Sequence, residues 1–134
     1  NVMSDRDLAA KLQQATAGLF WPSETDAGFE VVTWPDLDQI TTESLRDRLN
    51  LDPETPILIQ DFYDFFQPVT QEQAWHNAEE RAERERYQAL VQFLSEKLSN
   101  IQIFRVGEVE IDIYILGQTT HDQVMGLQTQ AVET

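Results

Sequence analysis

The chain has 134 residues, and 24 acidic residues against nine Lys and Arg give it a net charge of −15. Its length predicts one domain over residues 1–134 with a buried core, and its lack of cysteine excludes disulfides and thiolate metal sites. No apolar run approaches the roughly 18 residues of a membrane span, and the charged start is unlike a signal peptide, so we expect a cytoplasmic protein.

The first elements follow from helix and turn signals. Ser4 is a suitable N-cap with Asp7 three residues later, and apolar residues at helical spacing lead to Gly18, a natural helix stop. Residues 20–28, FWPSETDAG, are dense in turn-forming residues and predict a loop. Residues 29–34, FEVVTW, are rich in β-branched and aromatic side chains and predict a strand.

The next segment predicts a short helix and a short strand. Thr41 or Thr42 caps a helix that ends near Leu49. Residues 57–60, ILIQ, predict a buried strand, and residues 61–66, DFYDFF, predict a turn or a single helical turn.

A long helix is predicted from about Gln71 to Ser99, because apolar residues recur along one stripe. Its middle, EERAERER, predicts a solvated face with ion pairs at i,i+4 spacing, namely Glu80–Arg84 and Arg81–Glu85.

The remaining residues predict a hairpin and a final strand. Residues 101–106 and 109–116 flank Gly107, which suits a two-residue turn, and residues 126–134 could add a strand. The alternation of helices and strands predicts an α+β fold with a mixed sheet covered by helices.

Three carboxylates, Glu108, Glu110 and Asp112, stand at two-residue spacing in the hairpin and would share one face of a strand. A two-residue turn leaves Glu108 in the turn, pairs Arg105 with Glu110, and leaves Asp112 free. The same register places a set of apolar side chains on one shared face: Phe104, Val106, Val109, Ile111 and Ile113. A carboxylate hydrolase would need a second converging segment, so we favour a structural role for this row.

Other signatures of catalysis are absent from the sequence. His76 and His121 stand 45 residues apart without the spacing of a zinc helix, and the scattered glycines form no nucleotide-binding loop. There is neither a nucleophile elbow nor a basic cluster for nucleic acid. We therefore expect no enzyme activity and no cofactor.

Three features indicate protein recognition instead. The loop from Trp21 to Asp26 combines an aromatic residue, acids and hydroxyls, although Trp21 could equally belong to the core. Trp75 near the long helix is a second candidate, and core packing is its usual alternative. The end of the chain, up to Thr134, carries a carboxylate that could enter a partner's site, although many termini fray. The net negative charge favours a basic protein partner and disfavours nucleic acid and anionic membranes.

The chain resembles the nuclease A inhibitor family of small acidic bacterial proteins over nearly its full length. The resemblance is carried, in order, by GLFWPSE (18–24), FEVVTW (29–34), DFYDFFQPVTQEQAW (61–75), FRVGEVEIDIYILGQT (104–119) and GLQTQAVET (126–134). It implies an α/β/α sandwich related to the pathogenesis-related-1 fold. It also implies a non-enzymatic inhibitor that blocks the active site of a sugar-non-specific, metal-dependent ββα nuclease.

The resemblance also implies which residues bind the nuclease: Glu24, Trp75 and Thr134. Glu24 would take the place of a phosphate against a basic cleft, and the Thr134 carboxylate would approach the nuclease's divalent ion. One position departs from the family, because an acidic residue is expected before the tryptophan and Ala74 stands there. This departure motivates an alternative, a small acidic binding module of the same fold with a different, non-nuclease partner.

Overall fold

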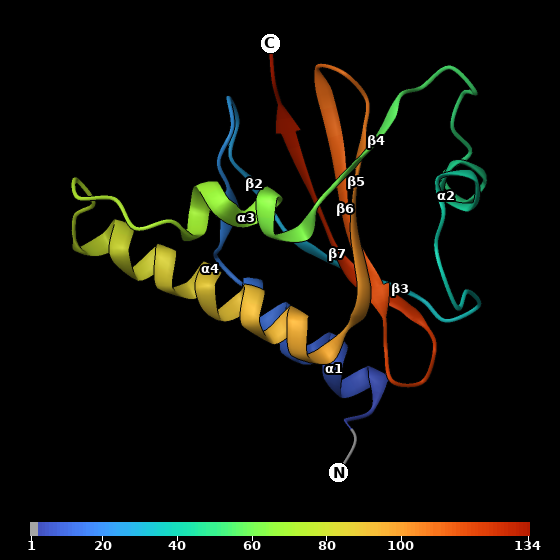
Figure 1. The fold of residues 1–134 in the computed structure, drawn as a ribbon, viewed down its shortest axis with the longest axis horizontal. Coiled ribbons are helices and arrows are strands. Elements are labelled where there is room, and N and C mark those ends of the chain that lie inside the picture. The colour runs from blue at the N-terminus through green and yellow to red at the C-terminus, as the bar shows by residue number, and fades with distance from the viewer. Residues whose placement is uncertain (1–2) are drawn as a thin grey trace.

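The computed structural model describes residues 3–134 (Figure 1), and residues 1–2, at the start of the segment considered as a signal peptide, lie outside it. The helices are α1 (Asp5–Thr16), α2 (Thr42–Arg48), α3 (Phe62–Thr70) and α4 (Ala78–Lys97). The strands are β1 (Phe20–Trp21), β2 (Ala27–Gly28), β3 (Glu30–Trp34), β4 (Ile57–Gln60), β5 (Ser99–Val106), β6 (Glu110–Gln118) and β7 (Val124–Val132).

The main sheet has five strands in the order β3-β7-β6-β5-β4, and every neighbouring pair is antiparallel. The prediction of a mixed sheet is therefore wrong, because strands that run in the same direction, such as β3 and β4 at the two edges, are never neighbours in this sheet. The predicted final strand is confirmed as β7, which lies inside the sheet between β3 and β6.

Helices lie on both faces of the sheet, as Figure 1 shows. Helices α1, α3 and α4 pack on one face around a core that includes Leu12, Phe65 and Leu94. Helix α2 inserts Leu45 into a second core on the other face. The structure is thus α+β, as predicted. None of the helices within residues 3–134 combines the length and apolar character that crossing a bilayer requires.

Several local predictions are confirmed by the caps. Ser4 caps α1 and accepts a hydrogen bond from the backbone N–H of Asp7, while Thr41 caps α2 in a reciprocal capping box with Ser44. Gly18, just beyond α1, has a φ of 73°, which suits a helix stop.

Two helix boundaries differ from the prediction. Helix α4 begins at Ala78 instead of Gln71, because Asn77 and Glu80 form a capping box that starts it there. Residues 62–70 form a longer helix where a turn or a single helical turn was predicted over residues 61–66, and the Asp61 carboxylate caps this helix by accepting from two backbone N–H groups.

The predicted loop 20–28 is a two-stranded antiparallel ribbon, β1–β2, closed by a turn over residues 22–26.

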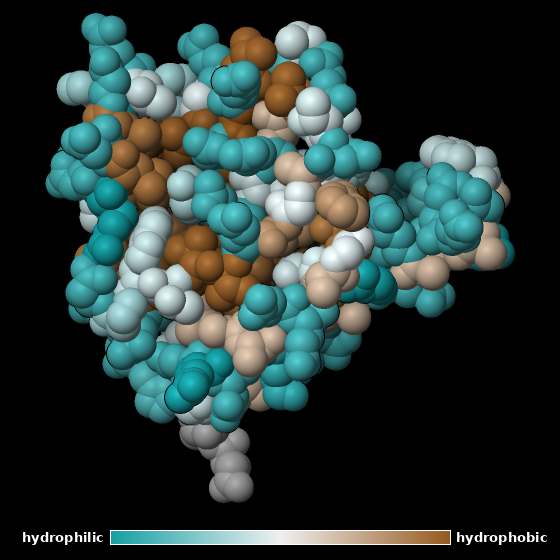
Figure 2. All heavy atoms as spheres, turned by 180° about the vertical axis from the view of Figure 1, so that it is seen from behind, coloured by the Kyte–Doolittle hydropathy of each residue, from teal (hydrophilic) through white to brown (hydrophobic). Residues whose placement is uncertain are grey.

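The strand predicted at residues 57–60 is confirmed, but its predicted burial is not. Leu58 is 63% exposed and Ile59 is 49% exposed, because β4 is an edge strand of the sheet. In the rear view of Figure 2, apolar side chains reach the surface as separate patches among hydrophilic ones.

The predicted register of the β5–β6 hairpin is wrong. Val106 pairs with Asp112 and Arg105 pairs with Ile113, so the loop is longer than two residues. The odd shift places Phe104 and Val106 in the core beside α2 and Ile111 and Ile113 in the opposite core. Val109 belongs to neither face, because it is 49% exposed in the loop.

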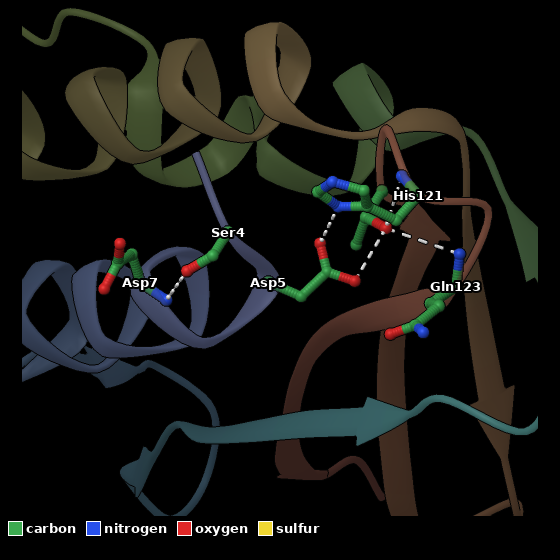
Figure 3. Close-up of polar contacts among 6 residues, drawn as sticks. Ser4, Asp5, Asp7, His121 and Gln123 are labelled. Carbon is green, nitrogen blue, oxygen red and sulfur yellow. Dashed lines mark hydrogen bonds and ion pairs between the residues drawn. The ribbon is translucent and has the colours of Figure 1, made fainter. Parts of the chain in front are cut away.

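A polar cluster joins the start of α1 to the turn between β6 and β7 (Figure 3). The Asp5 carboxylate contacts Nδ1 of His121 at 2.9 Å and accepts from the hydroxyl group of Thr119 at 3.1 Å. The same hydroxyl oxygen accepts from the backbone N–H groups of His121 and Gln123. This cluster gives His121 a structural role.

Candidate partner-binding site

The turn of the β1–β2 ribbon lies against the end of β7. The hydroxyl oxygen of Ser23 accepts from the backbone N–H of Val132 at 3.1 Å, and the hydroxyl group donates to the carbonyl of Thr25 at 2.6 Å. The backbone N–H of Glu24 adds a longer contact to the Val132 carbonyl at 3.4 Å. Backbone and side chain together therefore hold this turn to the C-terminal tail.

This arrangement brings together two of the predicted site residues. The hydroxyl group of Thr134 donates a hydrogen bond of 2.6 Å to Oε1 of Glu24. Both residues are exposed. Glu24 and Thr134 thus form one surface feature, which we call the tail corner.

The base of the ribbon is held by the aromatic core. Trp21 is only 7% exposed and stacks on Phe65, with 4.2 Å between ring centroids, so the interpretation of Trp21 as a core residue is correct. The hydroxyl group of Tyr87 donates to the Phe20 carbonyl. Burial raises the pKa of Tyr87, and Glu83 raises it further, which keeps this hydroxyl group protonated as a donor.

The tail is also tied to the β5–β6 hairpin. The backbone N–H of Glu133 donates to the Val109 carbonyl at 2.9 Å, and its carboxylate pairs with Arg105. The predicted pairing of Arg105 with Glu110 is therefore wrong. The Arg105–Glu133 pair holds the tail against the hairpin, while Thr134 at the end of the tail is exposed.

The row of three acids does not form a cluster. Glu108 lies in the hairpin loop, as predicted, Glu110 stands opposite Val132, and Asp112 accepts a hydrogen bond from the Gln130 side chain at 3.2 Å. Within residues 3–134, no group of three or more His, Asp or Glu side chains is arranged to hold a metal ion.

Trp75 lies on a different segment, the connection between α3 and α4. Its side chain is 73% exposed, so the interpretation of Trp75 as a core residue is wrong. This connection projects from the body of the molecule, at the left in Figure 1 and at the right in Figure 2, whereas the C terminus lies at the top of Figure 1. The structure therefore joins Glu24 to Thr134 but does not bring Trp75 to them.

Sequence reasoning included Ser23 in the recognition loop but missed its contact with Val132, and it missed the Arg105–Glu133 pair. A serine in a turn-rich segment signals a local hydrogen bond, and Ser23 makes one to Thr25. Its bond to Val132, 109 positions away in the chain, depends on tertiary structure and leaves no local pattern. The partner of Arg105 depends on the hairpin register, which a short motif does not determine.

The fold and the tail corner define a small acidic α+β protein with an exposed carboxylate held beside its C-terminal tail. The family model of the nuclease A inhibitor-like protein matches residues 6–134, essentially the whole chain. The chain therefore belongs to the nuclease A inhibitor-like protein family, as its resemblance indicated. No curated protein matches it.

Proposed function

We propose that this protein is a non-enzymatic inhibitor of a sugar-non-specific, metal-dependent ββα nuclease and that it acts in the cytoplasm. Membership of the nuclease A inhibitor-like family supports a nuclease as the partner. The contact between Glu24 and Thr134 is the observation that carries the proposal, because it gathers acidic and oxygen-donor groups at one exposed corner. The family resemblance extends to a sandwich of the pathogenesis-related-1 type, and the helices on both faces of the sheet agree with it.

In this proposal the tail corner enters the nuclease cleft. A cleft that binds polyanions is basic, and the Glu24 carboxylate replaces a phosphate against its Arg or Lys side chains. The α-carboxylate of Thr134 offers a hard oxygen ligand to the nuclease's own Mg²⁺ or Mn²⁺. The net charge of −15 speeds the encounter by electrostatic steering.

Trp75 makes a second contact in the proposal. An exposed tryptophan supplies a large apolar area at low entropic cost, and such residues dominate many interfaces. Because Trp75 projects on its own segment, it would contact the nuclease outside the cleft entered by the tail corner.

The test is a DNA-degradation assay with a non-specific ββα nuclease, titrated with this protein in excess Mg²⁺. When Mg²⁺ is in excess, a loss of cleavage cannot be explained by the acidic protein binding the metal ions. We expect stoichiometric loss of cleavage for the natural chain and weaker inhibition by a chain that ends at Glu133. A chain with one glycine added after Thr134 is the matched control, because it keeps the Thr134 side chain but moves the carboxylate.

Ala74 favours the alternative, a binding module with a non-nuclease partner, because the family resemblance leads us to expect an acidic residue at this position. The assay separates the two functions. Undiminished cleavage at large molar excess, repeated with several such nucleases, would contradict inhibition and leave the binding module as the better hypothesis. An Ala74→Glu variant that gains inhibition would show that this position decides the choice of partner.

A further inference from the structure

The C-terminal tail is anchored residue by residue, and the anchors belong to two different segments. The turn of the β1–β2 ribbon holds Val132 and Thr134. The β5–β6 hairpin holds Glu133, whose backbone N–H donates to the Val109 carbonyl and whose carboxylate pairs with Arg105. Both segments therefore restrain the tail, and the hairpin does so with one backbone hydrogen bond and one ion pair.

Ion pairs are few among residues 3–134, and one of them involves this tail. The pairs predicted within α4 are wrong, because Arg81 and Arg84 instead reach the backbone carbonyl and Nδ1 of His76, at 2.8 Å and 3.2 Å. Of the three ion pairs in this part of the chain, only Arg105–Glu133 joins a strand to the tail. This pair is therefore the ionic link between the sheet and the tail within the described residues.

Arg105 is the fixed member of this pair. It lies within β5, where it is paired with Leu58 of β4 and Ile113 of β6, and its side chain is only 15% exposed. Glu133 follows the last residue of β7, and its side chain is 52% exposed. Residues that leave a strand near a terminus fray unless they are tied down. Arg105 therefore restrains the tail, and the tail does not restrain Arg105.

We propose that Arg105 is a positioning residue, which holds Glu133 and thereby keeps Thr134 beside Glu24 in the tail corner. The effect on binding rests on the proposed function, whereas the restraint of the tail is a property of the free protein. A tail that is already ordered loses less conformational entropy when it enters a cleft. Without the ion pair, part of that entropy would be lost only on binding.

The positive charge of Arg105 makes the expected effect distinctive. Beside the tail corner, this charge opposes the attraction of the acidic protein to a basic cleft and compensates the charge of Glu133. Electrostatic steering alone therefore predicts that removal of the Arg105 charge strengthens inhibition. Positioning of the tail predicts that the same change weakens inhibition. The direction of the change thus distinguishes the two effects.

Four variants separate the charge of Arg105 from its contact with the tail. Arg105→Met removes the charge and keeps an apolar side chain against the sheet, whereas Arg105→Lys keeps a positive donor. Arg105→Glu is made alone and together with Glu133→Arg, so that the pair is first disrupted and then restored with its charges exchanged. Arg6→Met on α1 is the matched control, because Arg6 is exposed and forms no ion pair among residues 3–134.

The first measurement follows amide hydrogen exchange at Glu133 and backbone order at Thr134 by NMR in the free protein. We expect Glu133 exchange to accelerate about threefold to tenfold in Arg105→Met, and at least as much in Arg105→Glu, while amides inside β6 stay unchanged. Arg105→Lys, the exchanged pair and Arg6→Met should remain close to the natural protein. Unchanged exchange in Arg105→Met, or acceleration spread over the whole sheet, would overturn the positioning role.

The second measurement titrates the same proteins against a ββα nuclease in excess Mg²⁺. We expect about threefold to tenfold weaker inhibition by Arg105→Met and Arg105→Glu, and recovery in Arg105→Lys and in the exchanged pair. Arg6→Met should inhibit at least as well as the natural protein, because it also loses one positive charge. Stronger inhibition by Arg105→Met would overturn the link to binding.

The two measurements distinguish failure of this inference from failure of the proposed function. If the natural protein inhibits no such nuclease, the proposed function fails, and the exchange rate at Glu133 alone decides whether Arg105 holds the tail. If the natural protein inhibits and Arg105→Met inhibits equally well, the proposed function stands and the role of Arg105 in binding is wrong.

Discussion

The hydroxyl group of Thr134 donates a hydrogen bond of 2.6 Å to the carboxylate of Glu24, and this contact joins residues 110 positions apart. The negative charge of Glu24 can therefore be removed without removing the oxygen atom that accepts from Thr134. In Glu24→Gln the side-chain oxygen can still accept from Thr134, but the negative charge is lost.

Under the proposed function, the Glu24→Gln variant should inhibit the nuclease at least about tenfold more weakly, because the proposed charge-assisted bond to a basic residue of the nuclease cleft would be lost. Its thermal unfolding should be unchanged, since Glu24 is exposed. The Glu54→Gln variant makes the same charge change on the loop before β4 and should inhibit normally. Equal inhibition by all three proteins would remove Glu24 from the binding site.

Ser23→Ala tests the attachment of the ribbon turn to β7. The substitution leaves the backbone N–H of Val132 without its acceptor and should lower the free energy of unfolding by about 1–3 kcal/mol. Amide exchange at Val132 should accelerate more than exchange elsewhere in β7. Ser95→Ala on the exposed face of α4 is the control and should change stability by less than about 0.5 kcal/mol.

Gly126→Ala tests the packing inside the sheet. A Cβ at this position would overlap the backbone carbonyl of Ile115 on the neighbouring strand, and backbone in the middle of a sheet has little room to shift. We expect a loss of about 3 kcal/mol or more in urea unfolding. In Gly28→Ala the nearest atom, Cε1 of Phe20, lies at an ordinary 3.9 Å, so that variant should stay within about 0.5 kcal/mol of the natural protein.

The buried tyrosine predicts how stability changes in alkali. Burial raises the pKa of Tyr87 above its ordinary value of 10.0, so the unfolded chain loses the phenol proton at a pH where the folded protein keeps it. Stability from this group is fully present below about pH 10 and is lost as the pH rises further. Urea unfolding between about pH 9 and 11.5 should show this decline.

The matched variant for the alkaline decline is Tyr87→Phe, which removes the titrating group and the hydrogen bond to the Phe20 carbonyl. It should be less stable at neutral pH but lose stability less steeply above about pH 10. Some decline should remain, because burial also raises the pKa of Tyr114, with Asp112 and Glu30 adding to the effect. A slope identical to that of the natural protein would contradict the assignment to Tyr87.

Features encoded by a few adjacent residues could be predicted from the sequence. The Ser4 and Thr41 caps and the strand that ends at Trp34 all arise from local hydrogen bonding or side-chain type. The register of the β5–β6 hairpin could not be predicted, because it also depends on how β6 pairs with β7. The relative directions of the strands could not be predicted either, because they depend on the long connections between the strands. The packing of the whole core sets the paths of these connections.

The candidate site also combines features that adjacent residues predict with features that only the whole fold determines. The loop around Glu24 could be recognised by its composition, but its contact with Thr134 requires β7 to lie beside the ribbon. Trp75 could be recognised as a candidate, yet its exposure follows from α4 starting at Ala78, which leaves Trp75 outside the helix.

The position of β7 inside the sheet has a consequence for biosynthesis. Strand β3 is joined to the rest of the sheet through β7, although almost ninety residues separate Trp34 from Val124. A ribosome-bound chain that lacks residues 124–132 cannot close the sheet or bring the ribbon against the tail. The Glu24–Thr134 contact therefore forms only after β7 has been synthesised and has paired with β3 and β6.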